Sequence, residues 1–150
     1  MLSCSTLPLR AVLALMLAGP ALTAAAADPA GPLHISRGAE VDLADYLVPG
    51  KTVVFDFYSE YCPPCRAYAG PLAQMDRQRD DVVVVKVDIN RPGVTRIDWR
   101  SPVAQQYGLR SVPHFKVYGP DGQLLAEDNP KTRQAAARRM VHELLTAPAG

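Results

Sequence analysis

The chain has 150 residues, of which 48% are hydrophobic, 7% aromatic and 21% charged. This composition is typical of one globular domain and excludes disordered and collagen-like proteins. Sixteen basic and fifteen acidic residues give a net charge of +1, so the chain lacks the positive field that binds nucleic acid. We therefore expect no nucleic-acid partner. The unusual residues are 14 prolines and three cysteines, and their positions are more informative than their number.

The first 27 residues resemble a secretory signal peptide. An apolar run, Ala11–Gly19, is followed by small residues up to Ala27. We expect cleavage after Ala27, export to the periplasm and loss of Cys4 with the signal; the alternative is an uncleaved anchor that holds the protein on the membrane, facing the periplasm. The exported chain then keeps only Cys62 and Cys65. Because a loop this short is a weak structural staple, an oxidising compartment favours redox chemistry for this pair.

The expected elements alternate between helices and strands. Residues 28–38 are rich in Pro and Gly and are expected to form a flexible lead-in to one domain over residues 39–147. In chain order we expect a helix over Ala39–Val48, a buried strand over Thr52–Tyr58, a helix over Pro63–Arg79, a strand over Val82–Ile89, a loop over Asn90–Ser101, a helix over Pro102–Tyr107, a hairpin of Phe115–Tyr118 and Gln123–Ala126, and a helix over Lys131–Thr146. This order predicts an α/β fold, a central mixed sheet with helices on both faces.

A pair of cysteines stands between the first buried strand and its helix. Cys62 and Cys65 enclose Pro63 and Pro64, which limit the freedom of the backbone. A helix N-terminus favours negative charge through its dipole and its free N–H groups, so we expect Cys62 to be the nucleophilic thiolate. Cys65 lies one turn further on, within reach of a disulfide with Cys62. A structural zinc site is the alternative, but no second CxxC or CxxH is present to complete four ligands.

The segment FDFYSEYCPPC resembles the active-site segment of the thioredoxin superfamily, and the resemblance covers about residues 41–145. Asp56 matches the buried aspartate of the family, and Lys86 matches the lysine near that aspartate. Ser111–Pro113 matches the family's cis-proline segment. The pieces VDLADYLVPGK, CPPC, YGLRSVP and PDG also resemble the exported TlpA-like branch. The resemblance implies a thioredoxin-like fold and a thiol–disulfide oxidoreductase.

The resemblance also implies roles for the matching residues. The redox group would be the Cys62–Cys65 disulfide, with no bound cofactor. Burial in an apolar strand would raise the pKa of Asp56, which would then be able to take the proton from Cys65, while Lys86 moderates the shift. The alternatives are an aspartate bonded to backbone at the strand end and a lysine whose ammonium reaches the surface.

A substrate groove is expected around the cysteines. A cis bond before Pro113, as opposed to an ordinary trans turn, would bring the backbone of Val112 beside Cys62 to pair with an extended peptide. Trp99 is expected to pack as an anchor of its loop; the alternative is that it lines the groove together with Tyr61. His114 either tunes the thiolate, offers a metal nitrogen, or faces solvent without a role. The residues assigned to substrate binding are Tyr61, Pro63, Pro64, Val112, Pro113 and His114.

The leading interpretation is a periplasmic reductase of protein disulfides that uses no metal. Its partners would be protein thiols and disulfides and a membrane electron donor, and the protein would be a monomer. A disulfide oxidase is the alternative within the same class. A different class is a Cu(I) chaperone that binds the metal through Cys62, Cys65 and His114. A third is a domain that binds thiol peptides without turnover.

Overall fold

The computed structural model describes residues 31–129 and 134–148. The expected signal peptide, including Cys4, therefore lies outside the described residues. Among the residues that are described, no helix is both long enough and apolar enough to span a bilayer.

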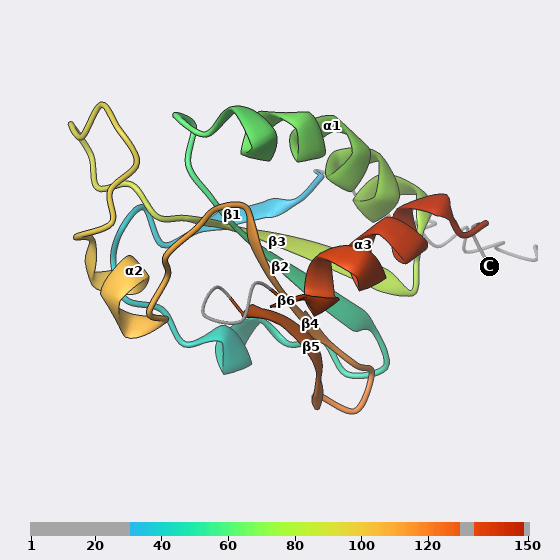
Figure 1. Cartoon of the computed structure of the whole chain (residues 1–150). Helices are drawn as coiled ribbons and strands as arrows, with labels where there is room; N and C mark the ends of the chain where they lie inside the picture. Colours follow the sequence, from blue (N-terminus) through green and yellow to red (C-terminus); the bar gives the residue numbers. More distant parts are fainter. Residues whose placement is uncertain (1–30, 130–133, 149–150) are drawn as a thin grey trace, which may run out of the picture.

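A mixed sheet forms the centre of the molecule (Figure 1). Its strands are β1 (Leu33–Ile35), β2 (Thr52–Tyr58), β3 (Val82–Asp88), β4 (His114–Tyr118), β5 (Leu124–Asn129) and β6 (Gln134–Ala135). They lie in the order β1-β3-β2-β4-β5-β6. The pairs β1–β3 and β2–β3 are parallel, and β2–β4, β4–β5 and β5–β6 are antiparallel. The predicted mixed sheet is confirmed.

Helices cover both faces of this sheet. They are α1 (Pro63–Gln78), α2 (Pro102–Gln106), α3 (Ala136–Thr146) and a 3-10 turn, η1 (Leu43–Tyr46). Figure 1 shows α1 and α3 on one face and α2 with η1 on the other. Successive residues of β2 point to opposite faces of the sheet, so Val54 packs against Leu72 of α1 and Val141 of α3. Phe55 packs with Val103 on the α2 face. The sheet thus separates two apolar cores.

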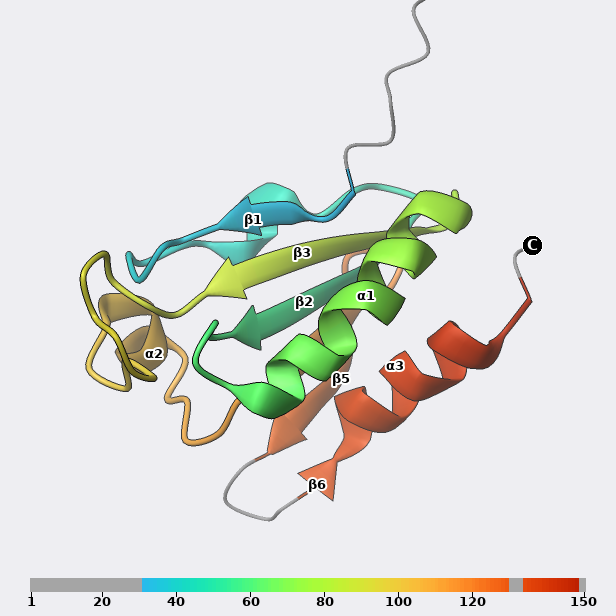
Figure 2. The same ribbon diagram turned by 90° about the horizontal axis from the view of Figure 1, so that it is seen from above.

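Three loops gather at one end of the sheet (Figure 2). The loops that follow β2 and β3 lie at the carboxyl ends of parallel neighbours, and the loop before β4 arrives at the same end because β4 is antiparallel to β2. The register of β2 and β3 also places Asp56 opposite Lys86. This end of the sheet therefore brings together the residues that the sequence assigns to the site.

The expectation of a flexible lead-in is wrong for Leu33–Ile35, which form β1 at the edge of the sheet. The strand pairs with β3, with His34 opposite Lys86, and Ile35 joins the core on the α2 face. A strand of three residues is too short to show an alternating pattern, and only its pairing with β3 defines it.

The helix expected over Ala39–Val48 is also wrong, because only the single turn η1 forms. Asp42 caps this turn by accepting a hydrogen bond from the Ala44 N–H. Before it, the backbone of Val41 is held by side chains of the α2 segment: Gln106 bonds both its N–H and its carbonyl, and the Tyr107 hydroxyl donates to the carbonyl. These tertiary bonds replace those that a helix would have made.

The last helix begins later than Lys131. Residues 131–133 lie outside the described residues, Gln134–Ala135 form β6, and α3 begins at Ala136. Its first turn is capped from a distance, since a carboxylate oxygen of Asp128 on β5 accepts a hydrogen bond of 3.0 Å from the Arg138 N–H. The start of the helix is therefore set by β5, which the local pattern does not reveal. The other expected helices and strands are confirmed with small shifts at their ends.

Candidate redox site

The two cysteines lie at the N-terminus of α1, where they form a disulfide. Their Cα atoms are 5.3 Å apart, within the range of ordinary disulfides. Pro63 and Pro64 occupy the first helical positions, where a missing N–H breaks no helical bond. The Sγ of Cys62 takes the place of a capping oxygen and accepts a hydrogen bond of 3.2 Å from the Cys65 N–H. Because Pro63 and Pro64 carry no N–H, the Cys65 N–H is the backbone donor of this first turn that faces the sulfur expected to be the nucleophile.

The segment before β4 lies against the disulfide. The Val112–Pro113 bond is cis, as expected, and the carbonyl oxygen of Val112 lies 3.5 Å from the Sγ of Cys62. Pro113 is buried, and its own carbonyl accepts a hydrogen bond from Arg138. The structure thus brings Val112 and Cys62 together, whereas Pro63 and Pro64 are exposed beside them.

A buried ion pair lies in the sheet beneath α1. Asp56 is completely buried, and its Oδ2 accepts a hydrogen bond of 2.7 Å from the Nζ of Lys86, which is 4% exposed. The other carboxylate oxygen of Asp56 has no hydrogen-bond partner among the described residues. Burial raises the pKa of Asp56, and the Lys86 ammonium opposes this shift. The alternative of a surface lysine is wrong.

Asp56 and Cys65 face the same layer of the molecule. Asp56 follows Val54 by two residues in β2 and therefore shares its α1-facing side. Cys65, Leu72 and Met75 form the buried face of α1 that packs on this side. A carboxylate and the inner sulfur of the disulfide thus point into one apolar layer, a setting in which a proton could pass between them.

Two residues that the sequence analysis missed extend this pair toward the edge of the sheet. The Nζ of Lys86 lies 4.3 Å from the ring centre of Tyr58, and the Tyr58 hydroxyl lies 3.0 Å from Nδ1 of His34. Burial raises the pKa of Tyr58 to about 12, with Asp88 adding to the shift. Tyr58 could have been found because it follows Asp56 by two residues in a strand. His34 could not be predicted from its neighbours in the sequence, because the strand that carries it, β1, was not predicted.

His114 is buried, so the alternative of a solvent-facing side chain is wrong. It is 2% exposed, and its ring meets that of Phe57 edge-on at 5.7 Å. Its Nε2 is 3.6 Å from a carboxylate oxygen of Glu127, and neither ring nitrogen makes a hydrogen bond among the described residues. Burial lowers the pKa of His114, while Asp128 and Glu127 oppose the shift. The ring lies below the surface that a substrate would touch.

The structure does not gather a metal site around the cysteines. Across residues 31–129 and 134–148, no three His, Cys, Asp or Glu side chains lie close enough to bind one ion. The set of Cys62, Cys65 and His114 that a Cu(I) chaperone would need is therefore not brought together.

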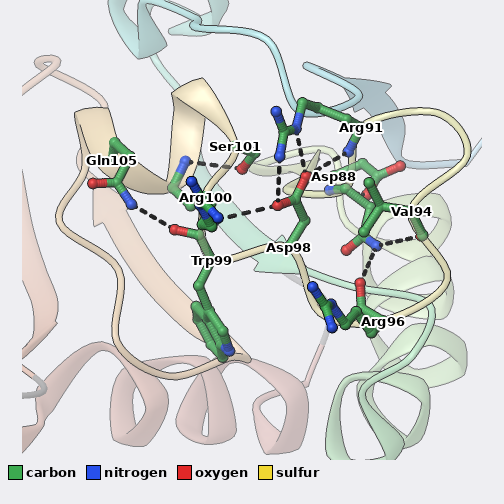
Figure 3. A network of polar contacts seen from close by, with 11 residues as sticks. Asp88, Arg91, Val94, Arg96, Asp98, Trp99, Arg100, Ser101 and Gln105 are labelled. Carbon is green, nitrogen blue, oxygen red and sulfur yellow. Dashed lines mark hydrogen bonds and ion pairs between the residues drawn. The ribbon is translucent and has the colours of Figure 1, made fainter.

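Tyr61 and Trp99 meet beside the redox pair. Both residues line a surface cavity of about 590 Å³ together with residues 95–98 and Arg100. Tyr61 is half-buried and immediately precedes Cys62. Trp99 is 36% exposed, so the expectation that its ring packs as an anchor of the loop is wrong, and the alternative, that it lies beside Tyr61, agrees with the lining of this cavity. Its backbone is anchored instead, because its carbonyl accepts a hydrogen bond from the Gln105 side chain (Figure 3).

The comparisons with known proteins agree with this geometry. The family model described as Thioredoxin matches residues 40–142. Thioredoxin F1, chloroplastic, of Arabidopsis thaliana is 36% identical over 67 residues, which are 45% of this chain and 34% of that protein. The Thioredoxin of Mycoplasmoides gallisepticum is 30% identical over 91 residues, which are 61% of this chain and 80% of that protein.

A solved structure, that of a mutant thioredoxin from Halobacterium salinarum, is similar with a TM-score of 0.52 and 25% identity. The alignment covers 83% of this chain and 98% of that one. The chain spans about a third of the length of the chloroplast relatives that it matches. The match to the family model extends over more than half of the sequence and includes the cysteine pair, the buried aspartate and the cis-proline. The chain belongs to the thioredoxin family.

Proposed function

We propose that this protein is a thiol–disulfide oxidoreductase that reduces protein disulfides in the periplasm. The observation that carries the proposal is the Cys62–Cys65 disulfide at the start of α1, with the Val112 carbonyl 3.5 Å from the Cys62 sulfur. A free backbone edge beside a reactive sulfur allows an extended peptide to pair there. The names of the relatives, which are thioredoxins, support the same class of reaction.

The reaction begins from the reduced pair. The Cys62 thiolate attacks one sulfur of a substrate disulfide, an S–S bond forms between enzyme and substrate, and the second substrate sulfur leaves as a thiolate that takes a proton from water. Cys65 then loses its proton and attacks the Cys62 sulfur, which releases the first substrate sulfur and closes the Cys62–Cys65 disulfide. Two electrons pass from the dithiol to the substrate, and a donor of reducing equivalents must restore the dithiol.

Asp56 is the proposed acceptor of the Cys65 proton. It is the buried carboxylate that faces the α1 layer, and its raised pKa makes it a better base than an exposed aspartate. The Lys86 ammonium stabilises the charged carboxylate and so opposes the rise that burial causes in the pKa of Asp56. A group that takes the Cys65 proton when the disulfide closes returns it when the disulfide opens, so Asp56 serves both directions. The reduction potential of the Cys62–Cys65 pair decides between reductase and oxidase, and the resemblance to the TlpA-like branch is what favours the reductase.

The proposed location and the proposed electron donor rest on the sequence of the first 27 residues. The apolar run Ala11–Gly19 and the small residues before Asp28 support export, and an exported reductase needs electrons from a donor in the membrane. Expression of the full chain with its own leader in a bacterial host tests this point. The mass of the protein from the periplasmic fraction should correspond to a chain that begins at Asp28, and recovery of an intact chain in the membrane would favour an anchor.

The activity is tested by equilibrating the protein in dithiothreitol and glutathione buffers and by measuring insulin-disulfide reduction for wild type and Cys62→Ser. A reducing potential together with loss of activity in Cys62→Ser supports the reductase. A potential near that of strong oxidants would instead support the oxidase, and turnover that survives Cys62→Ser would refute both. Cys65→Ala should accumulate a mixed disulfide with substrate, because the resolving thiol is absent, and mass spectrometry would identify the trapped partner.

A further inference from the structure

Residues 90–101, in the loop between β3 and α2, are held together by hydrogen bonds within the loop itself. The buried Asn90 side chain donates hydrogen bonds to the Val94 and Arg96 carbonyls, the second at 2.6 Å. The Asp98 carboxylate, 5% exposed, accepts from the Arg91 guanidinium at 2.7 Å and from the Arg100 N–H at 3.2 Å (Figure 3). Two buried polar side chains thus hold the backbone in one shape before any partner arrives. A partner that binds this loop would therefore lose little free energy to ordering its backbone.

The loop presents a surface to solvent beside Cys62. In Figure 3 the Trp99 ring points away from the polar network. Arg96 and Arg100 are exposed, and their side chains take no part in that network, which uses only their backbone groups. With Tyr61, these three residues line the cavity of about 590 Å³ described above. We call this set, Tyr61, Arg96, Trp99 and Arg100, the loop wall.

The charge of the loop wall is positive. Neither Arg96 nor Arg100 forms an ion pair with any carboxylate in the part of the chain that the structure describes. The acidic residue of the same cavity, Asp98, is buried and neutralised by Arg91. The Glu60 carboxylate, which raises the pKa of Tyr61 through a side-chain hydrogen bond, lines the neighbouring cavity together with Tyr61, and Arg96 and Arg100 do not line that cavity. A partner that enters the loop-wall cavity therefore meets two unpaired guanidinium groups and two aromatic rings.

We propose that the loop wall selects protein substrates in which the disulfide is flanked by acidic residues and by an apolar or aromatic side chain. Carboxylates of the substrate would pair with Arg96 and Arg100, and the apolar side chain would lie against Trp99 and Tyr61. This inference rests on the proposed function and names its substrate class. Complementary charge at an exposed rim acts chiefly on the association rate, so the preference should depend strongly on salt.

The test compares two synthetic peptides that carry the same internal disulfide and a phenylalanine, flanked by glutamates in one and by lysines in the other. The measured quantity is the ratio of kcat/KM for the acidic peptide to that for the basic peptide. For wild type we expect a ratio of about ten at low salt that approaches one in high salt. Arg96→Glu and Arg100→Glu should each lower the ratio about fivefold. Arg77→Glu is the matched control, because Arg77 is exposed in the last turn of α1, far from Cys62, and gives the same change of charge.

The outcomes separate the two proposals. A wild-type ratio near one at low salt, or an equal effect of Arg77→Glu, would overturn the selection by the loop wall while leaving the reductase intact. Failure of wild type to reduce either peptide would refute the proposed function itself. Trp99 is the single tryptophan of the chain, so its fluorescence reports directly on the wall. Titration of Cys62→Ser with the reduced acidic peptide should shift this emission, and an unchanged emission would also overturn the inference.

Discussion

Replacement of Lys86 by methionine would isolate the role of the buried ion pair. Methionine keeps an unbranched apolar chain of similar length but removes the ammonium group that lies 2.7 Å from Asp56. The carboxylate would then remain in a fully buried position with burial as the dominant influence, and the pKa of Asp56 would rise further. We therefore expect Asp56 in Lys86→Met to hold its proton to a higher pH than in wild type.

The effect of Lys86→Met on stability depends on whether the Asp56 carboxylate that remains is charged or protonated. A carboxylate left charged, buried and unpaired would cost about 3–5 kcal/mol. Protonation of Asp56 removes that charge, so the cost falls to the loss of one charge-assisted hydrogen bond, about 1.5–3 kcal/mol. We expect Lys86→Met to lower the free energy of unfolding of the oxidised protein by about 2 kcal/mol at neutral pH.

The pH dependence has a definite sign. Burial raises the pKa of Asp56 above its ordinary value of 3.8, so the folded chain binds this proton more tightly than the unfolded chain. The stability contributed by the proton is fully present below 3.8 and is lost as the pH rises through the raised folded value. In Lys86→Met that loss should move to higher pH. Urea unfolding across pH 4 to 9 measures it, and the pH profile of insulin reduction should move in the same alkaline direction.

Two further variants test whether Asp56 is the titrating group and whether Lys86 controls it. Asp56→Asn removes the titrating group, so its stability should no longer fall over this pH range, and its rate of insulin reduction should fall about a hundredfold. The double variant Asp56→Asn with Lys86→Met removes both partners and should be more stable than expected from the sum of the single losses. A pH profile of Lys86→Met that coincides with wild type would show that Lys86 does not control Asp56.

Three other substitutions test the core, the loop and the backbone. Leu72→Ala, at a fully buried position on the sheet-facing side of α1, should lower the free energy of unfolding in urea by about 3 kcal/mol. Asp98→Asn should weaken the loop network. Because the hydrogen bond from Arg91 lowers the pKa of Asp98, the stability that this carboxylate contributes is present at pH values above the ordinary aspartate pKa and is lost as the pH falls through the lowered pKa. Acid unfolding curves measure this loss. Gly38→Ala should be more destabilising in urea than Gly93→Ala: both glycines have positive φ, but an added Cβ lies 2.6 Å from Arg91 only at Gly38.

Each of these has a result that would contradict it. Leu72→Ala should be compared with Gln74→Ala on the exposed side of α1, and equal losses would mean that burial is not the cause. Acid unfolding curves of Asp98→Asn and wild type that stay parallel below pH 4 would refute the linkage to Arg91. Equal losses for Gly38→Ala and Gly93→Ala would show that the close approach at Gly38 has no energetic weight.

The residues of the redox pair and of the strand beneath it could be predicted because their signals are local. The dense β-branched and aromatic run Thr52–Tyr58 is buried along nearly its whole length, and its bounds in the structure are the expected ones. Cys62 and Cys65 lie at the start of the expected helix, and their spacing alone places both sulfurs within reach of each other. Val112–Pro113 was found through its resemblance to a family segment, and the structure shows why the position matters, since it lies against Cys62.

The remaining features depend on contacts between distant parts of the chain. Val41 is held extended by Gln106 and Tyr107, which lie 65 and 66 residues away, so a helical pattern there gives only one turn. The side chain of His114 carries no sign of whether it faces the core or solvent, and the packing of Phe57 against it decides the matter.

The sequence by itself determined the chemistry, because a cysteine pair at a helix N-terminus and an aspartate in a buried strand are recognised from neighbouring residues. The tertiary structure decided the surroundings of that chemistry. Sheet register brought Lys86 to Asp56, the edge strand brought His34 to Tyr58, and a buried carboxylate, Asp98, shaped the loop that turns Trp99 toward solvent. The physical reason is that hydrogen bonds and burial act between residues that are close in space, whatever their separation along the chain.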